Sequence, residues 1–164
     1  MNSEPSGNKA DEQQVPRIVV VGVGNLLLKD EGVGIHVVQH LQEMDLPPDI
    51  ELIDGGTAPD LIAYIKAGDK LIIVDAAKAG GEPGTVYRFL PEELATETST
   101  LASAHELGVE SNLRLMSLMG NEPREIVIIG VEPKEIDWGT ELTAELQQRI
   151  PKILDTVLKE TGII

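Results

Sequence analysis

The chain has 164 residues, of which 41% are hydrophobic and only 2% aromatic, and its formal net charge is −15. This length suits one α/β domain, and its core must be built from aliphatic side chains. The acidic excess repels phosphate backbones and anionic lipids, which argues against nucleic acids and membrane surfaces as partners. Cysteine is absent, so disulfides, thiolate metal sites and cysteine nucleophiles are excluded.

The beginning of the chain differs in character from the rest. Residues 1–16 are polar and have neither a basic start nor an apolar stretch, so they do not form a secretory signal. We expect residues 1–16 to be a disordered lead-in and residues 17–164 to form a single domain. No apolar stretch approaches the length of a transmembrane helix, and we expect a cytoplasmic protein.

From residue 17 onward, short β-branched runs alternate with stretches of helical spacing. Strands are predicted at Ile18–Val21, Glu51–Asp54, Leu71–Asp75, Thr85–Leu90 and Glu125–Ile129. Helices are predicted at Gly32–Met44, Thr57–Ile65, Ser103–Met119 and Leu142–Glu160. The predicted fold class is therefore α/β: a single doubly wound, three-layer domain around a mostly parallel five-stranded sheet with one antiparallel strand.

Two local features of this pattern have structural consequences. The loop at residues 76–83 is too short for a parallel crossover, so Thr85–Leu90 should run antiparallel to Leu71–Asp75. Pro151 lies inside the last predicted helix and should kink or split it.

A glycine-containing loop, Gly22-Val23-Gly24-Asn25, follows the first strand, as in dinucleotide-binding proteins. However, Leu27 stands where such a loop needs a third glycine. Asp30 and Glu31 also place negative charge where a pyrophosphate would bind. These departures argue against a nucleotide site.

The histidines offer two further candidates for metal binding. His36 and His40 have a spacing that can chelate a metal, but both flank the apolar stripe of the first helix and are interpreted as surface histidines. His105-Glu106 resembles the start of a zinc-protease helix motif, but Val109 stands in place of the second histidine.

Acidic residues at strand ends form a stronger candidate site. In a doubly wound sheet with strand order 2-1-3, ligands bind at the carboxyl edge between the first and third strands. Glu31 lies in the loop after the first strand, Asp54 ends the second strand and Asp75 ends the third. Burying a carboxylate at such a position is costly unless a cation or hydrogen-bond donors receive it. Any one acid could simply cap a loop, but three at one edge favour a binding site.

His105 adds a nitrogen ligand to this edge. Ser103-Ala104-His105-Glu106 fits a capping box, which places His105 in the first turn of its helix. The positive end of the helix dipole disfavours imidazolium, so this histidine should stay neutral and able to bind metal. Glu31, Asp75 and His105 together suit nickel or zinc, with open coordination positions for water or a substrate carbonyl.

At these residues the sequence resembles the hydrogenase maturation endopeptidases, which process the large subunit of nickel–iron hydrogenases. The similar segments are residues 22–34, 54–57, 71–76, 103–108, 130–133 and 138–139. The resemblance implies a protease that removes a C-terminal extension from the large-subunit precursor after nickel insertion. It also implies that Glu31, Asp75 and His105 are the metal ligands, although many members have aspartate at the position of Glu31.

Several mechanisms and functions remain open from the sequence. Nickel supplied by the precursor could polarise the scissile carbonyl or activate water, with Asp54 as the proton acceptor. An aspartic-protease-like pair of Asp54 and Asp75 is the second mechanism. A non-proteolytic nickel-binding chaperone or sensor with the same three ligands is an alternative function. A small-molecule hydrolase or nucleotide binder at the same crevice is another. We expect a monomer.

Overall fold

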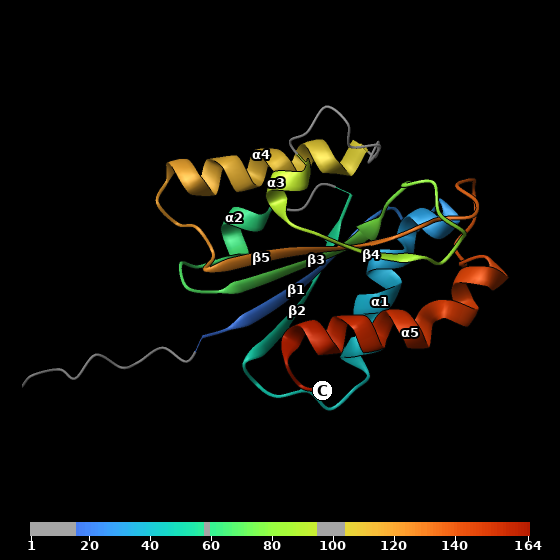
Figure 1. The fold of residues 1–164 in the computed structure, drawn as a ribbon, viewed down its shortest axis with the longest axis horizontal. Coiled ribbons are helices and arrows are strands. Elements are labelled where there is room, and N and C mark those ends of the chain that lie inside the picture. The colour runs from blue at the N-terminus through green and yellow to red at the C-terminus, as the bar shows by residue number, and fades with distance from the viewer. Residues whose placement is uncertain (1–15, 58–59, 95–103) are drawn as a thin grey trace, which may run out of the picture.

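The computed structural model describes residues 16–57, 60–94 and 104–164, so most of the expected lead-in at residues 1–16 lies outside the described residues. The described strands form one five-stranded sheet in the order β2-β1-β3-β5-β4 (Figure 1). Their bounds are β1 (Ile18–Val23), β2 (Ile50–Gly56), β3 (Lys70–Ala76), β4 (Val86–Phe89) and β5 (Glu125–Val131). All neighbouring strands are parallel except β4, which is antiparallel to β5. The predicted α/β fold class is confirmed.

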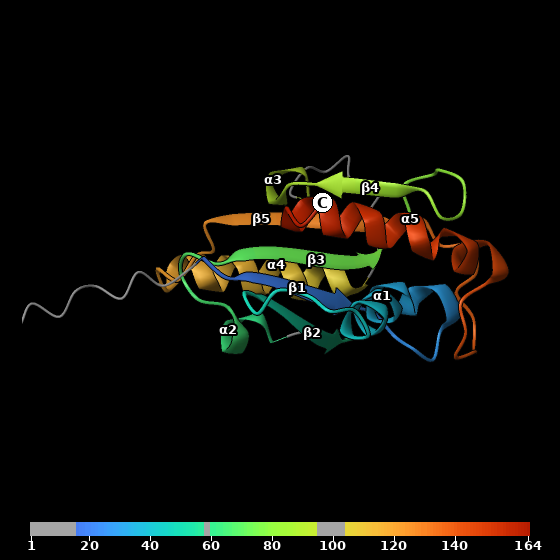
Figure 2. The same ribbon diagram turned by 90° about the horizontal axis from the view of Figure 1, so that it is seen from below.

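Helices cover both faces of this sheet (Figure 2). Their bounds are η1 (Lys29–Gly32), α1 (Val33–Gln42), α2 (Leu61–Tyr64), α3 (Pro91–Leu94), α4 (Ala104–Leu118) and α5 (Ala144–Thr161). The helices α1 and α5 contact each other on one face, and α2 and α4 contact each other on the opposite face. Among the described residues, every helix is too short or too polar to span a membrane.

The two faces of the sheet bury alternate residues of the same strands. In β1, Val20 belongs to the core beneath α1 and α5, whereas Val19 and Val21 belong to the core beneath α2 and α4. Full burial of an aliphatic side chain of this size contributes about 1.5–3 kcal/mol. Strands that are buried on both faces therefore appear in the sequence as unbroken β-branched runs, which is why they could be predicted.

Two details differ from the prediction. The strand β4 has the predicted direction, but its hydrogen-bonded partner is β5, with Val86 opposite Val131. The reason is that β5 occupies the remaining side of β3 and leaves β4 at the edge of the sheet. In addition, α5 continues through Pro151 as one helix. Leu146 and Ile153 pack into the core on either side of the proline, and this packing offsets the missing N–H.

Glycines allow α1 and the loop before it to approach the sheet closely. A β-carbon at Gly34 would lie 2.1 Å from the carbonyl oxygen of Val74, and one at Gly24 would lie 2.0 Å from that of Glu31. Such distances are far below van der Waals contact, so only glycine fits at these two positions. The glycines after β1 therefore serve helix–sheet packing, and they bring the start of α1 to the carboxyl ends of β1 and β3.

Candidate active site

Glu31 and Asp75 lie at the carboxyl edge of the sheet, beside the junction of β1 and β3. Glu31 belongs to η1, which contacts β3, and Asp75 is the penultimate residue of β3. The strand order reverses at this junction, because β1 is followed outward by β2 and β3 by β5. Crevices at such reversals are the usual ligand sites of doubly wound sheets. The structure thus places both residues at the edge where the sequence predicted a site.

Asp75 is buried and lies on the face of the sheet that α4 covers. This orientation follows from strand alternation, since Leu71 and Ile73 belong to the core beneath α2 and α4. Its Oδ1 accepts a hydrogen bond of 2.8 Å from the backbone N–H of Ala76. Burial makes an ionised carboxylate dependent on nearby donors or cations, so Asp75 is well suited to receive a positively charged ligand.

His105 is the second residue of α4, and its side chain lies outside the described residues, as does Ser103 of the expected capping box. Its backbone can nevertheless be placed. The helix α4 ends at Leu118, shortly before β5 begins, and runs back along the sheet (Figure 1). Its length of about 22 Å matches the length of β5, about 23 Å. The backbone of His105 therefore lies near the carboxyl edge, on the same face as Asp75.

Asp54 lies at the same edge, two residues before the end of β2 rather than at the strand end that the sequence predicted, and it is separated from Asp75. Gly22 of β1 pairs with Asp54 on one side and with Val74 on the other. Two strand spacings, about 10 Å, therefore separate the backbone of Asp54 from that of β3. Being in register with Val74, Asp54 also faces away from the α4 side, on which Asp75 lies. The exposed Asp54 carboxylate accepts the N–H of Gly56 at 3.0 Å.

Asp30 is a residue of structural importance that the sequence analysis did not identify as such. It is completely buried, and its carboxylate accepts hydrogen bonds from the backbone N–H groups of Lys134, Glu135 and Thr143 at 2.8–3.0 Å. The hydroxyl of Thr143 lies 2.8 Å from Oδ2 of the same carboxylate. These charge-assisted bonds attach the loop that carries Glu31 to the segment after β5. The donors lie more than 100 residues away in sequence, so no local pattern revealed them.

Backbone hydrogen bonds strengthen this connection between the segments 27–31 and 134–143. The N–H of Lys29 donates to the carbonyl of Gly139, and the N–H of Gly139 donates to that of Leu27, both at 2.9 Å. The Lys29 ammonium also pairs with Glu135 at 2.7 Å. Two distant parts of the sequence therefore form one unit beside the candidate site.

The buried carboxylate of Glu132 organises the loop that follows Asp75. It accepts the N–H of Ala79 at 2.7 Å and the hydroxyl of Tyr87 at 3.1 Å. Burial, together with the Glu132 carboxylate, raises the pKa of Tyr87, so this hydroxyl remains a donor over the physiological pH range. The loop between β3 and β4 is thereby held in place next to Asp75.

His36 is not the surface histidine that the sequence indicated. Its side chain is half-buried, and its Nε2 is buried without a hydrogen-bond partner among the described residues. Burial lowers the pKa of His36, and the nearby His40 lowers it further. Among the described residues, which do not include the His105 side chain, no three histidine or acidic side chains are grouped closely enough to hold a metal ion.

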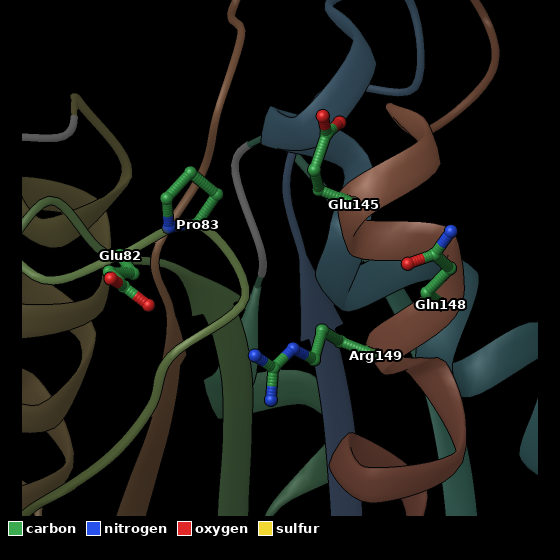
Figure 3. Close-up of a pocket in the computed structure, with 5 residues that line it drawn as sticks. All are labelled: Glu82, Pro83, Glu145, Gln148 and Arg149. Atoms are coloured by element: carbon green, nitrogen blue, oxygen red, sulfur yellow. The ribbon is translucent and has the colours of Figure 1, made fainter.

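A separate hollow lies between α5 and the loop that precedes β4 (Figure 3). It is lined by Glu82, Pro83, Glu145, Gln148 and Arg149. Figure 3 shows the Arg149 side chain extending from α5 toward this loop. There it packs over Gly84, where a β-carbon would lie 2.4 Å from the arginine Cγ. None of the acids predicted to form the site lines this hollow, so we do not assign it to the chemistry.

The chain is similar in sequence to proteins that mature hydrogenases. The profile of the hydrogenase maturation protease family matches residues 35–160. The chain is 34% identical to the hydrogenase 2 maturation protease of Escherichia coli (strain K12), over 90% of this chain and 93% of that protein. It is also 34% identical to the hydrogenase expression/formation protein HupD of Rhizobium leguminosarum bv. viciae, over 90% of this chain and 77% of that protein.

Solved structures agree with the sequence comparison. The hydrogenase maturating endopeptidase HybD from E. coli superposes with a TM-score of 0.77 at 31% identity, over 89% of this chain and 94% of that chain. These similarities identify a peptidase with a doubly wound α/β fold. The chain belongs to the hydrogenase maturation protease family.

Proposed function

We propose that this protein cleaves the large-subunit precursor of a nickel–iron hydrogenase and removes its C-terminal extension after nickel has been inserted. Membership of the maturation protease family supports the choice of substrate. The observation that carries the proposal is the arrangement at the carboxyl edge. Glu31 and Asp75 lie at the same edge of the sheet, beside the junction of β1 and β3, and the first turn of α4, which contains His105, lies on the face toward which Asp75 is directed.

In this proposal nickel belongs to the substrate and arrives with the precursor. Two carboxylates and one imidazole suit a borderline divalent cation and leave coordination positions for the ligands that the precursor provides. Because the chain has no cysteine to add a thiolate, three such ligands should bind free nickel only modestly. Glu31, Asp75 and His105 would therefore test whether the precursor contains nickel, rather than retain the ion.

The geometry argues against one of the two cleavage mechanisms. Nickel in the precursor would supply Lewis-acid polarisation of the scissile carbonyl. Asp54, exposed near the end of β2, would accept the proton of the attacking water. The alternative mechanism requires Asp54 and Asp75 to share a proton within hydrogen-bonding distance. It has less support, because β1 separates the two residues and strand alternation directs them to opposite faces.

The test compares two forms of the same precursor, one loaded with nickel and one without it. The parent protein is incubated with each, and the mass of the large subunit is followed by mass spectrometry. We expect only the nickel-loaded form to be shortened. Glu31→Gln should leave both forms intact, whereas Glu122→Gln, at an exposed position before β5, serves as a matched control and should cleave normally. Equal cleavage of both forms would exclude nickel recognition. Binding without cleavage would indicate a chaperone.

A further inference from the structure

Three large apolar side chains are exposed on the unit formed by the segments 27–31 and 134–143. Leu27 is 54% exposed, Ile136 38% and Trp138 76%. Trp138 is also the only tryptophan of the chain. Exposed aromatic side chains with apolar neighbours are typical of protein–protein contacts, and tryptophan is especially frequent among the residues that dominate binding. We call these three residues the Trp138 platform.

The backbone brings the members of the platform together. Gly139, the residue after Trp138, donates its backbone N–H to the carbonyl of Leu27, so Trp138 and Leu27 lie on adjoining stretches of backbone. Ile136 follows Glu135, whose carbonyl accepts the N–H of Asp30 at 3.2 Å. The platform therefore combines residues from two segments that are distant in sequence, and neither segment forms it alone.

The platform is held rigidly and adjoins the candidate active site. Its two segments are fixed to each other by the buried Asp30 carboxylate, which accepts hydrogen bonds from residues 134–143. Glu31, a proposed nickel ligand, directly follows Asp30. A surface that is fixed before binding loses little conformational entropy when a partner docks. Any partner on the platform would thus be placed beside Glu31.

The charge around the platform defines the complementary partner. The carboxylates of Asp137 and Glu141 are exposed beside it. The nearby lysines, Lys29 and Lys134, are already paired with Glu135 and Glu145. The electrostatic potential at the rim is therefore negative, in line with the net charge of the whole chain. A complementary segment would carry an apolar side chain flanked by lysine or arginine.

We propose that the Trp138 platform docks the hydrogenase large-subunit precursor through an apolar side chain with basic neighbours, close to the bond that is cleaved. This inference rests on the proposed function, because it takes the precursor as the substrate. Contacts made equally in the bound precursor and in the transition state lower KM without changing kcat. The platform should therefore govern KM, whereas Glu31, Asp54 and Asp75 should govern kcat.

The first experiment measures cleavage of the nickel-loaded precursor by Trp138→Ala. We expect KM to rise about tenfold with kcat unchanged, as for truncation of a central contact residue. Leu118→Ala is the matched control, because Leu118 is a 79% exposed apolar residue at the end of α4 that is remote from His105. It should behave as the parent. Higher ionic strength should also raise the KM of the parent. A parent-like KM for Trp138→Ala would overturn the proposal.

The second experiment observes the platform directly by fluorine NMR. Labelling the protease with fluorotryptophan gives a single protein resonance, from Trp138. Titration with nickel-loaded precursor should shift or broaden this resonance. If it responds to protease concentration alone, the platform joins two copies of this chain and the proposal is wrong. If it responds to a precursor that is never cleaved, docking stands and the proposed function fails. If cleavage proceeds with the resonance unchanged, the proposed function stands and docking fails.

Discussion

Thr143 contacts the Asp30 carboxylate through both its backbone N–H and its side-chain hydroxyl. The Thr143 N–H donates to Oδ1 of Asp30 at 2.8 Å, and the Thr143 hydroxyl lies 2.8 Å from Oδ2. Thr143 is the residue that precedes α5, but its hydroxyl makes no cap hydrogen bond within that helix. It serves the distant carboxylate instead, and this contact links the loop of Glu31 to the start of α5.

Asp30→Asn should strongly destabilise the protein. The substitution keeps the size of the side chain but removes the charge, and it turns an amide NH2 group toward backbone N–H donors. We expect a loss of about 3 kcal/mol in the free energy of unfolding, measured by urea denaturation. Thr143→Val should lose about 1 kcal/mol, because it removes only the hydroxyl. An unchanged urea midpoint for Asp30→Asn would show that the buried hydrogen bonds add no net stability.

Asp75→Asn should separate activity from stability. The amide oxygen can still accept the N–H of Ala76, while the charge that attracts a cation is lost. Removing a buried charge can even stabilise the fold when no cation is present. We expect a urea midpoint at or above that of the parent, weaker nickel binding by calorimetry and no cleavage of the nickel-loaded precursor. Cleavage at the parent rate would remove Asp75 from the proposed site.

Asp54→Asn tests the proposed proton acceptor. The residue is exposed and its amide oxygen can still accept the N–H of Gly56, so stability should change by less than about 0.5 kcal/mol. Loss of a general base lowers kcat by about 10²–10⁴-fold, and KM should stay near that of the parent. The measurement is the initial rate of precursor cleavage over a range of concentrations. A parent-like kcat would require another proton acceptor.

His36 should make stability depend on pH. Its pKa is lowered in the folded protein, mainly by burial, so protonation favours the unfolded chain, where the pKa is near the ordinary value of 6.5. The stability present above that value should decrease as the pH falls through the pKa of folded His36. His36→Gln cannot titrate. The difference in unfolding free energy between parent and variant should therefore be constant above pH 7 and should move in favour of the variant as the pH falls below about 6.5. A constant difference down to pH 5 would contradict this prediction.

The fold could be predicted from sequence where the controlling interactions are local or repetitive. The run Ile18–Val21 indicates a strand buried on both faces, and the structure extends it only to Val23. The short loop at residues 76–83 predicts the direction of β4. The strand that β4 pairs with depends on where β5, which comes later in the chain, enters the sheet. The helix α5 continues through Pro151 because residues on both sides of the proline pack into the core. The tendency of proline to break helices is a local property and does not take this packing into account.

The candidate site was predictable to a similar extent. The topology rule for doubly wound sheets places Glu31 and Asp75 at one edge without any coordinates. The separation of Asp54 from Asp75 depends on the strand register, which the sequence does not display. The role of Asp30 depends on donors that are brought to it only by the complete fold. The positions of these acids at the sheet edge could therefore be predicted from the sequence, whereas the structural role of Asp30 could not.

The dependence of Asp30 on Thr143 also bears on how the protein is made. Thr143 is added to the chain 113 residues after Asp30, when all five described strands have already been synthesised. A nascent chain that ends before residue 134 has none of the backbone donors that the Asp30 carboxylate uses in the finished protein. The loop of Glu31 therefore reaches its final position only after residues 134–143 have been synthesised. A chain that ends before residue 134 should accordingly be inactive toward precursors that are present in the same cell.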